Sequence, residues 1–173
     1  MTTRPLPILT QRECGRCSAC CTALATEEPD DATGPGTKQA GKDCRFLRPT
    51  SAKPCGVYDQ RPAMCRDFRC VWAAGALGVA DRPDKSGLVL TIQTSDTKFR
   101  PDGPQHALLA TEVWAGAART TGAHVIKSLA DTTLVFVQRR DGTRYLEGPM
   151  ALVQQVAAYL KSTEQESDHG PKV

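Results

Sequence analysis

The chain has 173 residues, of which 40% are hydrophobic and 24% charged. This composition is globular and excludes a disordered or fibrous protein. Lys and Arg number 22 against 19 Asp and Glu, so a net charge of +3 gives no reason to expect nucleic acid or an acidic membrane as the partner. No run of 18 apolar residues is present to span a bilayer.

Residues 1–13 are predicted to form an extended N-terminal arm. Their apolar stretch, Leu6 to Leu9, is interrupted by Pro7 and is too short for the hydrophobic region of a signal peptide. We therefore expect a cytoplasmic protein, in a compartment where thiols stay reduced.

All eight cysteines lie between Cys14 and Cys70, and the 103 residues that follow contain none. Such clustering indicates that the cysteines belong to one local structural unit, and it predicts a loop-rich, metal-stapled domain over residues 14–83. Within it, Glu27 to Lys42 is rich in Gly, Pro and charge, which predicts a loop. One short helix is expected after Pro62, with Cys70 just past its end.

Residues 84–162 have the apolar patterns of a second, small α+β domain. Leu88 to Ile92 predicts a strand. Asp102-Gly103-Pro104 is expected to open a helix that runs to about Thr121 and ends at Gly122. Its predicted apolar face carries Leu109, Val113, Trp114 and Ala117.

The remaining segments complete this predicted domain. His124 to Leu129 is expected to form a short strand. Thr133–Gln138 and Thr143–Leu146 predict a hairpin, because Asp141-Gly142 favours a tight turn. A final helix should follow Gly148-Pro149, and residues 163–173 are predicted to be a flexible tail. The expected fold class is α+β, with an antiparallel sheet and two helices in the second domain.

The cysteine spacing is the feature of the sequence that indicates metal binding. Cys14, Cys17 and Cys20 are separated by two residues each, which lets neighbouring sulfurs turn toward one cation, as in zinc and iron–sulfur sites. A disulfide framework is the disfavoured alternative, because no export signal is evident and adjacent cysteines pair poorly. All eight are candidate ligands: Cys14, Cys17, Cys20, Cys21, Cys44, Cys55, Cys65 and Cys70.

The sequence leaves two identities for the metal centre open. Eight thiolates make two four-thiolate zinc sites with none left over. The run from Cys14 to Cys20 also resembles the start of a ferredoxin-type run, with a distant cysteine as the fourth ligand of an iron–sulfur cluster. The metal could be purely structural, because a small loop-rich segment gains folding energy from it.

The segments CGRCSACC, CRFL and CGVYDQRPAMCRDFRC together resemble the CxxCxxCC cysteine-cluster family, described as zinc- or iron-chelating. The resemblance covers about residues 14–72, with Tyr58, Arg61-Pro62 and Phe68 beside the cysteines. It implies that all eight cysteines are candidate metal ligands. Some relatives are linked to lysine methylation of flagellin, but the chain has no recognisable S-adenosylmethionine loop, so that activity is not transferred.

Three functions follow as hypotheses. The first is a metal-binding protein whose second domain serves as a platform for a protein or small-molecule partner. The second is a metal- or redox-dependent enzyme or accessory factor. The third is a structural zinc module for protein contacts. Phosphate-loop, Rossmann and nucleophile-elbow patterns are absent, and His106, His124 and His169 are expected to be surface or packing residues. Phe68 and Trp72 are expected to pack over the metal site.

Overall fold

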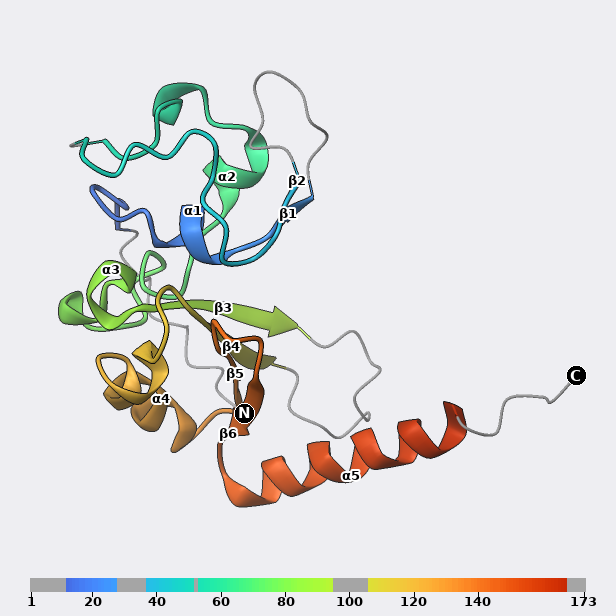
Figure 1. The fold of residues 1–173 in the computed structure, drawn as a ribbon. Helices are drawn as coiled ribbons and strands as arrows, with labels where there is room; N and C mark the ends of the chain where they lie inside the picture. Colours follow the sequence, from blue (N-terminus) through green and yellow to red (C-terminus); the bar gives the residue numbers. More distant parts are fainter. Residues whose placement is uncertain (1–11, 28–36, 52, 95–105, 168–173) are drawn as a thin grey trace, which may run out of the picture.

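A computed structural model gives the structure, and it describes residues 12–27, 37–51, 53–94 and 106–167. They form an α+β fold with a two-stranded and a four-stranded sheet. In Figure 1 the part that contains the cysteines lies above the four-stranded sheet, and the last two helices lie below it. Within the described ranges no helix has both the length and the hydrophobicity needed to cross a bilayer.

The cysteine-containing part has only short elements. They are α1 (Ala19–Ala23), β1 (Thr26–Glu27), β2 (Thr37–Lys38), the 3₁₀ turn η1 (Tyr58–Gln60) and α2 (Ala63–Asp67). β1 ends where the predicted loop begins and pairs antiparallel with β2, which lies inside that loop. The short helix predicted after Pro62 is confirmed as α2, with Pro62 as its N-cap residue. Residues 1–11 of the predicted arm and residues 28–36 of the loop lie outside the described ranges.

The second part forms the larger sheet. Its elements are η2 (Val79–Asp81), α3 (Pro83–Ser86), β3 (Leu88–Thr94), β4 (His106–Glu112), η3 (Ala117–Arg119), α4 (Ala123–Ala130), β5 (Val135–Gln138), β6 (Arg144–Glu147) and α5 (Met150–Ser167). The strand order is β3-β4-β5-β6. β4 and β5 run parallel while the other two pairs are antiparallel, so the sheet is mixed and the purely antiparallel sheet predicted from the sequence is wrong. A parallel pair needs a crossover, which α4 provides.

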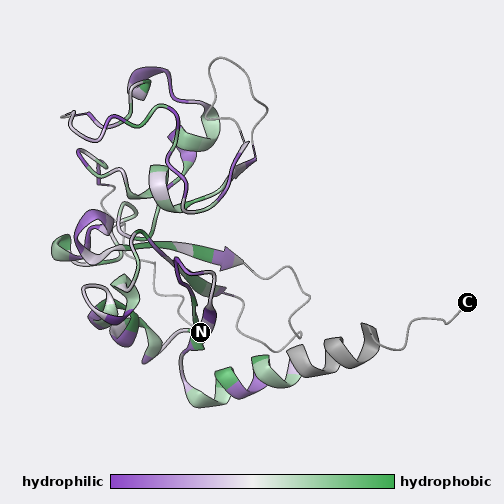
Figure 2. Cartoon of the chain, viewed as in Figure 1, coloured by the Kyte–Doolittle hydropathy of each residue, from purple (hydrophilic) through white to green (hydrophobic). Residues whose placement is uncertain are grey.

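The main core lies between this sheet and α4. Leu88, Leu90 and Ala110 are almost fully buried on β3 and β4, and Val125 and Ile126 contribute from α4. Figure 2 shows hydrophobic residues along β3 and on α4, with more polar residues in the cysteine-containing part. Apolar burial therefore stabilises the second part much more than the first.

The helix predicted from 102 to 121 is wrong over its described residues, because 106–112 form β4. Leu and Ala favour helices, but the segment pairs with β3 along its whole length, from Leu88 opposite Glu112 to Thr94 opposite His106. Burial alternates from Leu108 to Ala110, as in a strand, and Thr111 and Glu112 are both buried at its end. Residues 102–105 lie outside the described ranges.

The strand predicted for His124–Leu129 is also wrong, because Ala123–Ala130 form α4. Val125 and Ile126 are buried, and Leu129 and Ala130, four positions further on, pack against the same core. That spacing is one face of a helix. Gly122 begins the helix rather than ending one, and it must be glycine, since a Cβ would lie 2.4 Å from Leu88 Cδ1.

Three predicted elements are confirmed. The first strand is β3, and the hairpin is β5 and β6. Asp141 accepts hydrogen bonds from the Thr143 amide and hydroxyl, and Gly142 has a φ of +86°, as the predicted tight turn requires. The final helix is α5, which continues to Ser167 and so extends past Thr163, where the tail was predicted.

The two parts meet at β3. Ala19 and Ala23 of α1 are buried against Val89. Val71 donates its amide to the Leu90 carbonyl at 2.9 Å and joins the main core. Arg12 donates to the Leu77 carbonyl at 2.8 Å and lies over the Trp72 ring, 5.2 Å from its centre. These contacts fix α1, and with it two cysteines, on the sheet.

Candidate metal centre

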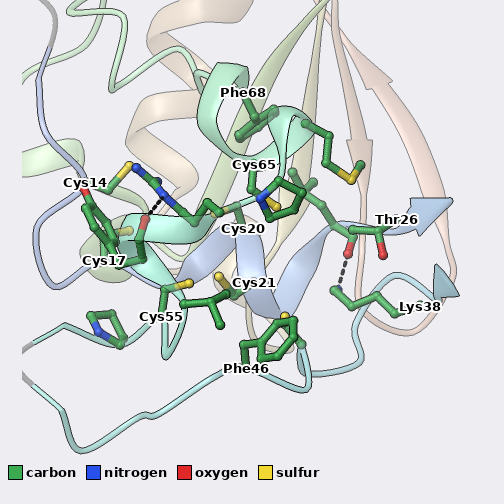
Figure 3. A pocket seen from close by; sticks show the side chains of 18 of the residues that line it. Cys14, Cys17, Cys20, Cys21, Thr26, Lys38, Phe46, Cys55, Cys65 and Phe68 are labelled. Carbon is green, nitrogen blue, oxygen red and sulfur yellow. Dashed lines mark hydrogen bonds between the residues drawn. The ribbon is translucent and has the colours of Figure 1, made fainter. Parts of the chain in front are cut away.

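Seven of the eight cysteines line one cavity of about 140 Å³. They are Cys14, Cys17, Cys20, Cys21, Cys44, Cys55 and Cys65. Figure 3 labels six of them, all but Cys44, and shows these six entering from α1, α2 and the intervening loops, with the Cys21 and Cys55 sulfurs turned toward one another. Cysteines up to 51 positions apart in the chain therefore share one cavity.

The first four cysteines are placed by a turn and a helix. The Cys17 amide donates to the Cys14 carbonyl at 2.9 Å, and Gly15 between them has a φ of +55°, which suits glycine. Cys20 and Cys21 then lie in α1. The two-residue spacing thus brings the tight run to one wall of the cavity.

The distant cysteines come from loops that are pinned to this run. The Cys44 amide donates to the Cys21 carbonyl at 2.9 Å. Cys55 pairs with Leu47 in an isolated antiparallel bridge. Cys65 lies in α2, whose last turn leads to Phe68 on the cavity wall. Backbone hydrogen bonds therefore hold cysteines that are distant in sequence at the cavity.

Cys70 is the exception. It follows the end of α2 and packs beside Ala19, Ala23 and Val89, at the contact between α1 and the sheet. Its sulfur accepts a weak hydrogen bond from the Ala73 amide at 3.5 Å. The structure places this predicted ligand next to the cavity but not on its wall.

Apolar groups and two cations complete the wall. Phe46 and Phe68 lie among the cysteines, whereas Trp72 is buried away from them beneath Arg12. Arg61 lies 3.9 Å from the centre of the Tyr58 ring and donates to the Tyr58 carbonyl at 3.0 Å. The expected cover over the site is therefore provided by Phe68 and not by Trp72.

Lys38 is the site residue that the sequence did not indicate, because it lies in the segment predicted as a loop. Its ammonium donates to the Leu24 carbonyl (Figure 3). It also donates to the Lys42 carbonyl at 2.8 Å. Burial lowers the Lys38 pKa, and the nearby Cys44 and Cys21 thiolates oppose that shift. A positive charge thus sits at the Cys21–Cys44 end of the cavity.

Cys20 and Cys21 titrate as a pair. A hydrogen bond between the two thiols is the main reason why the pKa of Cys21 is lowered to about 7 and that of Cys20 is raised well above the usual value. Lys38 and Arg61 lower the Cys21 pKa further. One member of the pair therefore loses its proton near neutral pH, and the second loses its proton with difficulty.

Other cavity thiols hold their protons more tightly. Burial raises the pKa of Cys17 to about 11, and burial also raises the pKa values of Cys14 and Cys55. The negative charge of Cys70 adds to the shift at Cys14. Metal binding would have to displace these protons, because the thiolate is the ligand.

The donor chemistry fits a thiophilic metal, since clustered thiolates suit zinc and iron–sulfur clusters. All eight cysteines are free thiols. Among the described residues, however, no group of three or more His, Cys, Asp or Glu side chains is close enough to hold a metal ion. The thiols therefore surround a shared space without forming a closed coordination shell.

The histidines lie away from the cavity or outside the described ranges. His106 is the exposed first residue of β4, and His124 Nε2 lies 2.8 Å from Asp81 Oδ1. His169 lies beyond the described residues. The described histidines thus have surface positions, as the sequence predicted.

Comparison of the chain with models of protein families, with curated proteins and with solved structures finds no match. The resemblance to the CxxCxxCC family therefore rests on the cysteine pattern and its flanking residues, and it stays a prediction.

Proposed function

We propose that this protein binds zinc or an iron–sulfur cluster through the cysteine thiolates of the cavity. The observation that carries the proposal is that seven cysteines from α1, α2, the turn before α1 and the loop between β2 and η1 line one cavity. A chain that kept cysteines only as small hydrophobic residues would have no reason to collect them there.

Electrostatics supports the same function. Several thiolates in one place repel each other, and an apolar wall makes each charge more costly. Lys38 and Arg61 offset part of this charge and lower the Cys21 pKa further, in addition to the larger effect of the hydrogen bond with Cys20. A bound cation would neutralise the rest and would replace the protons on Cys14, Cys17 and Cys55.

The sparse packing of the first part supports a structural contribution from the metal. Its buried apolar residues beside Val89 are the small side chains Ala19 and Ala23. Such a segment has little hydrophobic energy, and closure of thiolates around a metal would supply folding free energy. We propose that the thiols move into a closed shell as the metal binds.

The protein and its cysteine variants test this proposal directly. Cys17→Ser and Cys65→Ser remove cavity thiols from the tight run and from α2, and each should lower the zinc bound per protein after reconstitution under reducing conditions. Cys70→Ser is the matched variant from outside the cavity wall, and it should retain more zinc than either. Full zinc occupancy in both cavity variants would mean that neither cysteine is a ligand.

A metal- or redox-dependent enzyme, or an accessory factor of one, is the second candidate. The observation that favours it is the Cys20–Cys21 pair, which supplies a thiolate near pH 7 inside an apolar cavity. If the metal-free protein reacts with a thiol reagent fastest at Cys21, and metal does not protect this site, the redox function is favoured over metal binding.

A further inference from the structure

Arg140 links the β5–β6 hairpin to the cysteine-containing part. Its guanidinium donates from Nη1 to the Val113 carbonyl at 2.6 Å and from Nη2 to the Gly41 carbonyl at 2.6 Å. Val113 follows β4, whereas Gly41 lies between β2 and Cys44. One planar side chain thus bridges Val113, which lies 27 positions before it, and Gly41, which lies 99 positions before it.

The backbone of Arg140 is held by a buried carboxylate. Glu112 has only 2% of its surface exposed. Its Oε2 accepts the Arg140 amide and its Oε1 accepts the Ala118 amide, each at 2.9 Å. The turn closes through Gly142, whose amide donates to the Arg139 carbonyl at 3.1 Å. Arg140 therefore projects from a fixed turn.

Gly41, the residue that Arg140 contacts in the cysteine-containing part, lies in a segment that is hydrogen-bonded to α1 at two points. The Gly41 amide donates to the Ala23 carbonyl at 3.1 Å, at the end of α1. Three residues later, the Cys44 amide donates to the Cys21 carbonyl at 2.9 Å. The position of Gly41 therefore fixes how close the Cys44 loop lies to α1.

We propose that Arg140 is a positioning residue that couples the hairpin to the cysteine cavity, so that metal binding and hairpin order stabilise one another. This inference rests on the proposed metal-binding function. It goes beyond that function because Arg140 is not among the residues that line the cavity and lies on the other part of the chain. Coupling of two sites is reciprocal, so a bridge that strengthens metal binding must also be strengthened by it.

The test compares the full-length reduced protein with Arg140→Ala, Arg140→Lys and the control Arg144→Ala, an exposed arginine of the same hairpin. Zinc chloride is titrated into each against a competing chelator. Arg140→Ala should weaken zinc binding by at least about tenfold, the lower end of the effect of outer-shell residues. Arg144→Ala should bind like the original protein. Arg140→Lys, which cannot donate to both carbonyls with a planar fork, should fall between.

Amide hydrogen exchange supplies the readout that a merely structural role would not give. Zinc should slow exchange at Arg139, Arg140 and Gly142 in the original protein and in Arg144→Ala, but not in Arg140→Ala. If the original protein takes up neither zinc nor, on reconstitution, iron and sulfide, the proposed function fails; if it takes up iron and sulfide but no zinc, the coupling to zinc is overturned. If it binds zinc without slowing these amides, or if Arg140→Ala retains full affinity, the coupling is overturned and the metal site stands. Should Arg140→Ala not fold, Arg140→Lys and the exchange of the original protein decide the question.

Discussion

Glu112 offers a prediction whose size follows from the structure. Its buried carboxylate is the acceptor for two amides, one in η3 and one in the hairpin turn. Glu112→Ala removes both acceptors and leaves the buried Ala118 amide and the partly buried Arg140 amide without their partner. The free energy of unfolding should therefore fall.

A buried donor left without its partner costs about 1–3 kcal/mol, so the Ala118 amide alone predicts a loss of that size for Glu112→Ala, and the partly buried Arg140 amide adds a smaller loss because water reaches it. Glu112→Gln keeps one carbonyl oxygen but turns an NH₂ group toward the second amide. This variant loses one acceptor and should be destabilised less than Glu112→Ala.

Urea unfolding followed by circular dichroism, at one fixed zinc concentration, measures these differences. Glu147→Ala removes an exposed carboxylate from the same sheet and should change stability by less than about 0.5 kcal/mol. The reasoning is refuted if Glu112→Ala is no less stable than Glu147→Ala, or if Glu112→Gln loses as much as Glu112→Ala.

The other predictions concern metal, pH and packing. A chelator should unfold residues 14–72 and leave β3–β6 protected from hydrogen exchange, whereas an unchanged dichroism spectrum and melting temperature would count against a structural metal. Zinc affinity should rise as the pH rises from about 7 toward about 11, because the thiols of Cys21 and Cys17 must lose protons to bind; a flat profile would contradict proton displacement. Without metal, stability should fall as the pH rises from 9.0 through about 11, since Cys17 ionises at the lower value when unfolded and the higher when folded; constant stability there would contradict its burial. Gly122→Ala should cost about 1–3 kcal/mol through its clash with Leu88, and unaltered urea unfolding would contradict that close approach.

The sequence predicted those elements whose signals are local. β3 has a β-branched run, the β5–β6 turn has Asp141-Gly142, and α5 follows a Gly-Pro pair. It failed between residues 106 and 130, where β4 is rich in helix-forming Ala and Leu and α4 contains β-branched Val125 and Ile126. There the pairing with β3 and the packing of α4 on the sheet outweigh intrinsic preference.

Cysteine spacing predicted the candidate site because only cysteine supplies a thiol, so the candidate ligands can be identified from the sequence. It gave no reason to separate Cys70 from the rest, since burial against Val89 depends on how α1 packs on the sheet. Lys38 and Arg140 were missed for the same reason. Their roles arise from carbonyl groups brought near them by distant segments, and no local pattern marks such contacts.

Metal content after anaerobic purification tests the central claim most directly. Iron, acid-labile sulfide and zinc are assayed on the same sample, together with the visible spectrum. The account predicts stoichiometric thiolate-bound metal, with iron and sulfide giving a broad visible absorption and with zinc replacing them in aerobic preparations. Colourless protein with about two zinc ions and no sulfide would leave a zinc site as the answer. Protein that carries no stoichiometric metal, and takes up none under reducing conditions, would contradict the claim.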